Sequence, residues 1–321
     1  MKTILVPLDG SALAEQALPY VRMLALLLDA RVRLLTVIVD SQHESLLAEG
    51  IAAAYGAIDP LATLHEREHQ ALMTLTQHAE GYLDSHAALL RHQGIDTEID
   101  VRCGPAADVI VEAAAGQQIA MIAMATHGYS GLKRWALGSI TDKVAHSTTT
   151  PVLVVRGTKA APIEPVTLKR VMVPLDGSPL AAQALPLAAD LAERARAELL
   201  LMQAVEASIQ GYPTIAPLSR PDLMPSEMLG RLRALAGQLL NAQAAMLRDR
   251  GLPVTTHVVT GHAAEAIIDE AARQSVDLLV ISTHGYSGLK RWALGSVTDK
   301  VLHAATTPLL LVHANVSADL S

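Results

Sequence analysis

The strongest constraint on the fold of this chain is an internal repeat. The stretch THGYSGLKRWALGS occupies residues 126–139 and occurs again, letter for letter, at 283–296. A second motif, VPLDGS, occupies residues 6–11 and recurs at 173–178. Two motifs repeated in the same order indicate one structural unit written twice. We therefore predict two domains, residues 1–157 and 168–315, joined by a linker at 158–167 that is rich in small residues and proline.

Within each copy, short apolar runs alternate with helical patterns. In the first copy the runs TILVPL, RVRLLTVIV, TEIDVR, IAMIAMA and PVLVVR have the length and composition of buried strands. The segments between them have helical periodicity, and residues 63–93 suit a long, charged, mostly exposed helix. This alternation predicts the α/β class, with a parallel sheet covered by helices on both faces.

The helix after the first strand has the clearest pattern. Ala17, Val21, Leu24 and Leu28 fall on one stripe that would face the core. Proline lacks a backbone N–H and normally disrupts a helix interior, so Pro19 is expected to kink this helix. The same reasoning applies to Pro186 in the second copy.

Composition excludes several classes of partner. Lys and Arg number 25 against 32 Asp and Glu, so the chain lacks the positive field that holds nucleic acid or an anionic membrane. We expect neither partner. The single cysteine, Cys103, cannot form an internal disulfide, and no apolar run is long enough for a membrane span or a secretion signal. These features predict a soluble, cytoplasmic protein.

Both repeated motifs fall where ligands bind in open parallel sheets, beyond the carboxyl ends of the strands. Asp9 lies at the tip of the first predicted strand and is an acceptor suited to ribose hydroxyls or an adenine amine. Gly138 permits close approach of a ligand, and the helix that starts at Ser139 offers free amides and a partial positive charge. A nucleotide would satisfy both ends of such a crevice.

A structural interpretation stands beside this one. Ser139 followed by Asp142 also fits a capping box, so the motif would then only begin a helix, and Asp142 would oppose a nearby phosphate. Asp9 before glycine and serine would then be only a turn residue. A recent duplication would also leave identical loops. Both motifs are identical in the two copies although the sequences around them differ, and this favours a shared ligand.

These residues resemble the universal stress protein family. The resemblance rests on VPLDGS and on the spacing Ala125-x-x-Gly128, nine residues, Gly138-Ser139, which is similar to the family's ATP-binding pattern Gly-x-x-Gly-x9-Gly-(Ser/Thr). It covers nearly the whole chain, twice. It implies an open, Rossmann-like five-stranded sheet in the order 3-2-1-4-5 in each domain. It also implies that the last strands of the two copies pair as an internal pseudo-dimer, and a further homodimer is expected.

The resemblance implies one ATP site in each copy, with or without Mg2+, and no metal site built from the protein alone. In the first copy the implied contacts are Pro7, Asp9, Val37, Met124, Ala125, Gly128, Gly138, Ser139 and Ile140. In the second copy they are Pro174, Asp176, Ala204, Ile281, Ser282, Gly285, Gly295, Ser296 and Val297.

Two departures from the family pattern bear on affinity. Ala125 and Ser282 replace the first glycine, so the backbone there neither approaches a phosphate nor turns as freely as glycine would. Ala204 replaces Val37 and leaves a thinner adenine wall. We therefore expect the second site to be the weaker one.

Other functions compete with a regulatory nucleotide-binding protein. His65-Glu66-Arg67-Glu68-His69 matches the zinc-peptidase pattern, but the second copy lacks it and the helix lies away from the strand ends. Neither repeated motif pairs a base with a nucleophile, so we expect no efficient enzyme, although slow ATP hydrolysis is an alternative. A stress-response scaffold that binds no nucleotide is the other.

Overall fold

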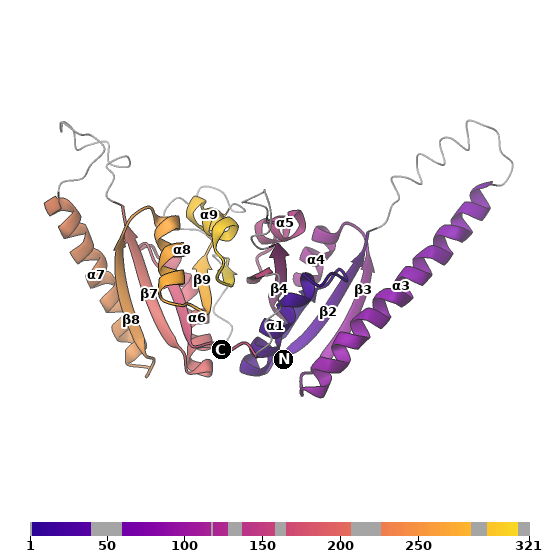
Figure 1. Ribbon diagram of the computed structural model, residues 1–321, viewed down its shortest axis with the longest axis horizontal. Helices are drawn as coiled ribbons and strands as arrows, with labels where there is room; N and C mark the ends of the chain where they lie inside the picture. The colour runs from indigo at the N-terminus through magenta and orange to yellow at the C-terminus, as the bar shows by residue number, and fades with distance from the viewer. Residues whose placement is uncertain are drawn as a thin grey trace.

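The computed structural model describes residues 2–39, 60–116, 118–127, 137–157, 165–206, 226–283 and 294–313 (Figure 1). Its strands form one sheet in the order β3-β2-β1-β4-β5-β10-β9-β6-β7-β8. The first half supplies β1 (Thr3–Pro7), β2 (Arg31–Ile38), β3 (Thr97–Cys103), β4 (Ile119–His127) and β5 (Val152–Gly157). The second half supplies β6 (Arg170–Pro174), β7 (Glu198–Val205), β8 (Val254–Thr260), β9 (Leu278–Ser282) and β10 (Leu309–Val312).

Each half has the strand order 3-2-1-4-5, and its neighbouring strands pair in parallel. The same pattern holds in the second half. The predicted α/β fold and strand order are therefore confirmed. The two halves join where β5 and β10 pair antiparallel, with Leu310 opposite Leu153. The last strands thus meet as expected, and two five-stranded sheets become one.

Helices cover both faces of this sheet. Those of the first half are η1 (Ala14–Ala17), α1 (Leu18–Leu28), α3 (Pro60–His92), α4 (Ala106–Ala114) and α5 (Ser139–Ser147). Those of the second half are η2 (Ala181–Ala184), α6 (Leu185–Ala195), α7 (Ser226–Arg248), α8 (Ala263–Arg273) and α9 (Ser296–Ala304). One apolar core joins the sheet to α1, α3, α6 and α7. A second core joins the opposite face to α4, α5, α8 and α9.

The predicted kink at Pro19 is wrong. The chain first forms the short 3-10 helix η1, and α1 then begins at Leu18 with proline in its first turn. Proline fits there because the first amides of a helix have no intrahelical acceptor in any case. Pro186 occupies the same position in α6. The predicted apolar stripe is confirmed, because Ala17, Val21, Leu24 and Leu28 are all buried.

Two details position the chemistry. β4 continues to His127, beyond its predicted end at Ala125, so Ala125 and its counterpart Ser282 lie in extended strand. Their backbones therefore do not need the conformational freedom of glycine, which corrects the part of the affinity argument that concerned turning of the chain and leaves the part that concerned close approach of a phosphate. Among the described residues, no helix is long and apolar enough to cross a membrane.

Candidate functional site

A cavity of about 260 Å3 opens at the carboxyl ends of β6, β7 and β9. The first turns of α8 and α9 complete its walls. Gly285 lies outside the described residues, and every other residue predicted for the second site lines this cavity. These residues are Pro174, Asp176, Ala204, Ile281, Ser282, Gly295, Ser296 and Val297.

The cavity also contains residues that sequence reasoning missed. Leu175, Ala181 and Thr298 are next to, or close to, predicted positions, whereas Ala263 and Ile267 come from the start of α8. Nothing in the local sequence of α8 marks it as part of a site. It contributes because it packs across the sheet face between the strands whose ends form the cavity.

In the second half, hydrogen bonds within the Asp-Gly-Ser turn fix the conformation of the chain at the end of β6. Asp176 Oδ1 accepts a hydrogen bond from the Ser178 amide at 2.8 Å, and Ser178 Oγ accepts one from the Ala181 amide at 3.0 Å. Gly177 has φ of +81°, a conformation that glycine adopts without strain. Asp176 is nevertheless exposed and lines the cavity. It is a turn residue that still presents a carboxylate to the site.

The helix start at the other end of the cavity carries no side-chain cap. Gly295 is the N-cap of α9, and Gly138 is the N-cap of α5 in the first half. Among the described residues, no side chain caps either helix, so the capping box at Ser139 does not form. The first amides of α9 therefore face the cavity without an intrahelical acceptor, and the helix dipole adds a partial positive charge.

The first half repeats this arrangement. Asp9 Oδ1 accepts a hydrogen bond from the Ser11 amide at 3.0 Å, and Gly10 again has φ of +81°. The Gly138 amide donates to Thr126 Oγ1 at 3.1 Å, which fixes the start of α5 against the end of β4. Of the other predicted residues, Pro7, Val37, Met124 and Ala125 lie in β1, β2 and β4, whereas Ser139 and Ile140 begin α5. Gly128 lies outside the described residues.

The two halves differ in the contacts that α3 and α7 make near the Asp-Gly-Ser turn. The Tyr82 hydroxyl in α3 donates to Glu15 Oε1 at 3.1 Å, and His86 Nε2 lies 3.3 Å from the same oxygen. Burial and the neighbouring Glu15 carboxylate raise the pKa of Tyr82. In the second half Leu239 packs against the turn, with Cδ1 at 3.6 Å from where a Cβ of Gly177 would lie. Polar contacts thus join α3 to η1 in the first half, whereas an apolar side chain of α7 lies against the turn in the second half.

A larger groove of about 600 Å3 lies between α1, the end of α3 and residues 165–168. Its lining is mainly apolar and contains none of the predicted site residues. Its size therefore does not make it the candidate site.

The His65–His69 pattern falls on α3, but the side chains of residues 60–68 are outside those described. Among the described side chains, no group of three or more His, Cys, Asp or Glu is placed to hold a metal ion.

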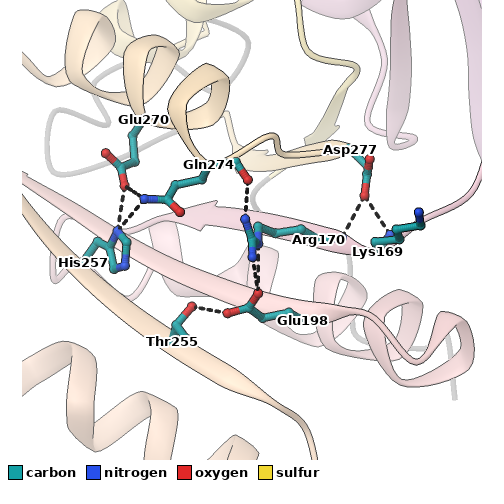
Figure 2. A network of polar contacts seen from close by, with 8 residues as sticks. All are labelled: Lys169, Arg170, Glu198, Thr255, His257, Glu270, Gln274 and Asp277. Carbon is teal, nitrogen blue, oxygen red and sulfur yellow. Dashed lines mark hydrogen bonds and ion pairs between the residues drawn. The ribbon is translucent and has the colours of Figure 1, made fainter.

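A polar network occupies the opposite, amino-terminal edge of the second half of the sheet (Figure 2). Arg170 at the start of β6 pairs with Glu198 at the start of β7, with Nη2 and Oε2 separated by 2.8 Å. His257 Nδ1 lies 2.6 Å from Oε1 of Glu270, whose side chain is 1% exposed. This histidine–carboxylate pair does not line the cavity, and its contacts join β8 to α8.

The Arg170–Glu198 pair predicts a loss of stability in acid. Burial opposes ionisation of Glu198, but hydrogen bonds from Thr255 and Arg170, together with the Arg170 charge, outweigh burial and lower its pKa. A lowered pKa in the folded state gives stability that is present above the ordinary value of 4.5 and is lost as the pH falls through the folded value.

We expect Glu198→Gln to remove this acid-sensitive component. Between pH 5 and pH 3 the wild type should lose more free energy of unfolding than the variant, by on the order of 1 kcal/mol or less. Urea titrations at several pH values measure this difference. Parallel pH profiles for the two proteins would contradict it, and Glu193→Gln, whose carboxylate pairs with Arg250 at an exposed site, serves as the control.

Comparison with known proteins agrees with this architecture. The sequence model of the Universal stress protein family matches residues 1–156 and 167–313. A universal stress protein of Mycolicibacterium smegmatis is 27% identical over 312 residues, which cover 96% of each chain. One of Synechocystis sp. is 23% identical over 315 residues, which cover 97% of this chain and 99% of the relative. The crystal structure of a universal stress protein from Archaeoglobus fulgidus superposes with a TM-score of 0.66 at 19% identity and covers 98% of both chains. Because the family's model matches both halves and the full-length relatives share this organisation, the chain belongs to the universal stress protein family as a tandem, two-domain member.

Proposed function

We propose that this protein binds an adenine nucleotide, ATP with or without Mg2+, as a regulatory ligand in the stress response, with one site in each domain. The observation that carries the proposal is the cavity at the ends of β6, β7 and β9, with its uncapped helix start. Its apolar walls suit a purine, the Asp176 carboxylate suits ribose hydroxyls, and the amides at Ser296 and Val297 suit a phosphate.

The conformation of the motif glycines supports a ligand constraint. Gly138 has φ of −61° and ψ of 136°, and Gly295 has φ of −62° and ψ of 149°, which any residue adopts. Among the described residues, a Cβ on Gly138 would meet only Thr126 Oγ1 at 3.7 Å and Thr141 Oγ1 at 4.0 Å. Neither the backbone nor packing against this part of the chain therefore requires glycine at position 138, whereas close approach of a phosphate does.

We further propose that the bound nucleotide is not turned over efficiently. Among the described residues that line the cavity, Asp176 is the only one with an ionisable side chain. General-base activation of water would need a better-placed partner. A non-binding interaction scaffold and a slow ATPase are the alternatives.

Isothermal titration of the nucleotide-stripped protein with ATP and Mg2+ tests the proposal. We expect about two equivalents to bind, and Gly138→Val or Gly295→Val to remove one each. A β-branched side chain at the helix start should weaken its own site by at least about 100-fold, on the order of 2.8 kcal/mol. The Gly295→Val protein then reports the first site and Gly138→Val the second, which we expect to be weaker.

The controls separate binding from folding. Gly230→Val replaces a glycine of α7 that has open space around it, and it should leave both sites intact. Thermal melting of each variant checks that the fold survives. Absence of binding up to millimolar ATP would favour the scaffold, and phosphate release at rates above those of buffer alone would favour the slow ATPase.

A further inference from the structure

Helices α5 and α9 face each other at the centre of the molecule, where the two domains join (Figure 1). Four of their side chains meet there. They are Asp142 and His146 of α5 and Asp299 and His303 of α9, and we call them the seam quartet. His146 Nε2 lies 3.7 Å from Asp299 Oδ1, and His303 Nε2 lies 3.9 Å from Asp142 Oδ1. Each histidine therefore faces the carboxylate of the other domain. All four come from one repeated pattern, Thr-Asp-Lys-Val-x-His.

Hydrogen bonds within each helix fix where the histidine protons lie. His146 Nδ1 is 2.8 Å from the carbonyl oxygen of Asp142, and His303 Nδ1 is 2.8 Å from that of Asp299. A carbonyl oxygen only accepts, so each Nδ1 carries the hydrogen. In a neutral ring, Nε2 is then a lone pair that faces a carboxylate oxygen across the seam. Two acceptors facing each other repel, and a proton on Nε2 turns the contact into an attraction between opposite charges.

Neighbouring charged residues do not form ion pairs with the four residues of the seam quartet in the described part of the chain. Among the described residues, the four have ion-pair partners only within the quartet. Lys143 points to Asp108 of α4, with Nζ and Oδ1 separated by 2.7 Å, and Lys300 is exposed. Arg156 of β5 crosses the seam below, and its Nε donates to the Ala305 carbonyl at 3.1 Å. This arginine stays charged throughout the range in which histidine titrates.

We propose that the seam quartet is a proton-operated contact between the two domains, which tightens as the pH falls through the range in which histidine titrates. Asp142 and Asp299 lie in the first turns of α5 and α9, the helices that begin at the two candidate sites. A change at the seam therefore acts on the elements that would hold phosphate. We infer that acid also alters nucleotide affinity, and this second part rests on the proposed function.

Hydrogen exchange of the nucleotide-free protein tests the seam directly. The amides of the β5–β10 ladder, between Val152–Val154 and Leu309–Leu311, report on the seam. The amides of β2 serve as an internal reference, because the chemical exchange rate of every amide changes with pH and a ratio to β2 removes that change. From pH 7.5 to 5.5 we expect seam protection, relative to β2, to rise about 5-fold, the scale of one or two partly exposed ion pairs. His146→Gln/His303→Gln, whose amides do not titrate, should change less than about 2-fold.

Matched variants show whether the effect belongs to the quartet. His262→Gln removes an exposed histidine whose Nδ1 is 3.9 Å from Glu206 Oε1, within the second domain, and it should leave the seam response unchanged. Asp142→Asn/Asp299→Asn should abolish the response while both histidines remain. Equal pH responses in the wild type and the His146→Gln/His303→Gln protein would overturn the proposal. Loss of the wild-type response on adding EDTA would also overturn it, because a metal ion would then be the bound cation.

ATP titration at both pH values tests the second part. The ratio of dissociation constants between pH 7.5 and 5.5 should differ at least about 2-fold between the wild type and the His146→Gln/His303→Gln protein. If seam protection responds but this ratio does not differ, the link to the sites is wrong and the seam contact stands. If no protein binds ATP, the proposed function fails while the exchange result remains valid.

Discussion

Replacing Leu153 by alanine is expected to lower the free energy of unfolding by about 3 kcal/mol, because it opens a cavity in the centre of the ten-stranded sheet. Leu153 is 1% exposed, and its partner across the seam, Leu310, is 0% exposed. Both belong to the apolar core that runs through the two domains. The lost contacts are thus shared by the two halves, and the surrounding strands have little freedom to fill the space.

Urea denaturation followed by circular dichroism measures this effect. Because Leu153 and Leu310 are direct neighbours, the double alanine variant should lose less than the sum of the two single losses. Leu235→Ala, on the exposed face of α7, should change stability by no more than about 0.5 kcal/mol. A Leu153→Ala protein as stable as Leu235→Ala would mean that the β5–β10 pairing does not form.

A second large effect is expected at the buried carboxylate of Glu270. Its Oε1 accepts from His257 at 2.6 Å and from Gln274 at 3.0 Å, and Arg273 pairs with the other oxygen. His257→Ala removes a donor from a charge that is almost wholly shielded from water. We expect a loss of about 2 kcal/mol, less than for a fully broken buried pair because Arg273 and Gln274 remain.

Glu270→Ala should cost less, about 1 kcal/mol, since it removes the buried charge itself and leaves His257 and Arg273 with access to water. The first domain offers a natural precedent: the corresponding position in α4 is Ala113, which is 3% exposed. His257→Ala/Glu270→Ala should therefore resemble Glu270→Ala alone. Urea titration of the three variants measures these costs, and a larger loss for Glu270→Ala than for His257→Ala would show that our view of the network is wrong.

The sequence predicted the elements of this fold well because they depend on local patterns. Buried parallel strands are short apolar runs, and the stripe from Ala17 to Leu28 has the period of a helix. The prediction of a kink at Pro19 was wrong because the start of the helix was placed too early. Periodicity alone does not distinguish a 3-10 turn followed by a helix from one continuous helix. The capping box at Ser139 was a similar case, since the helix begins at Ser139 itself, one residue earlier than that pattern requires.

The candidate site was only partly visible in the sequence. Repetition marked the Asp-Gly-Ser turn and the Gly-Ser helix start, but nothing marked Ala263 or Ile267 of α8, which reach the cavity through packing. Asp142 shows the limit most clearly. From sequence it was expected to oppose a phosphate, whereas its carboxylate contacts His146 of its own helix and His303 of the other domain.

The sequence by itself therefore determined the repeat, the α/β class and the residues at each strand end, because these follow from spacing along the chain. The tertiary structure alone decided that α5 and α9 meet and that Glu270 is enclosed by His257, Gln274 and Arg273. The meeting of α5 with α9 depends on the antiparallel pairing of β5 with β10, which brings together residues more than a hundred positions apart. A local sequence pattern cannot predict this contact, because the contact depends on how the two sheets join.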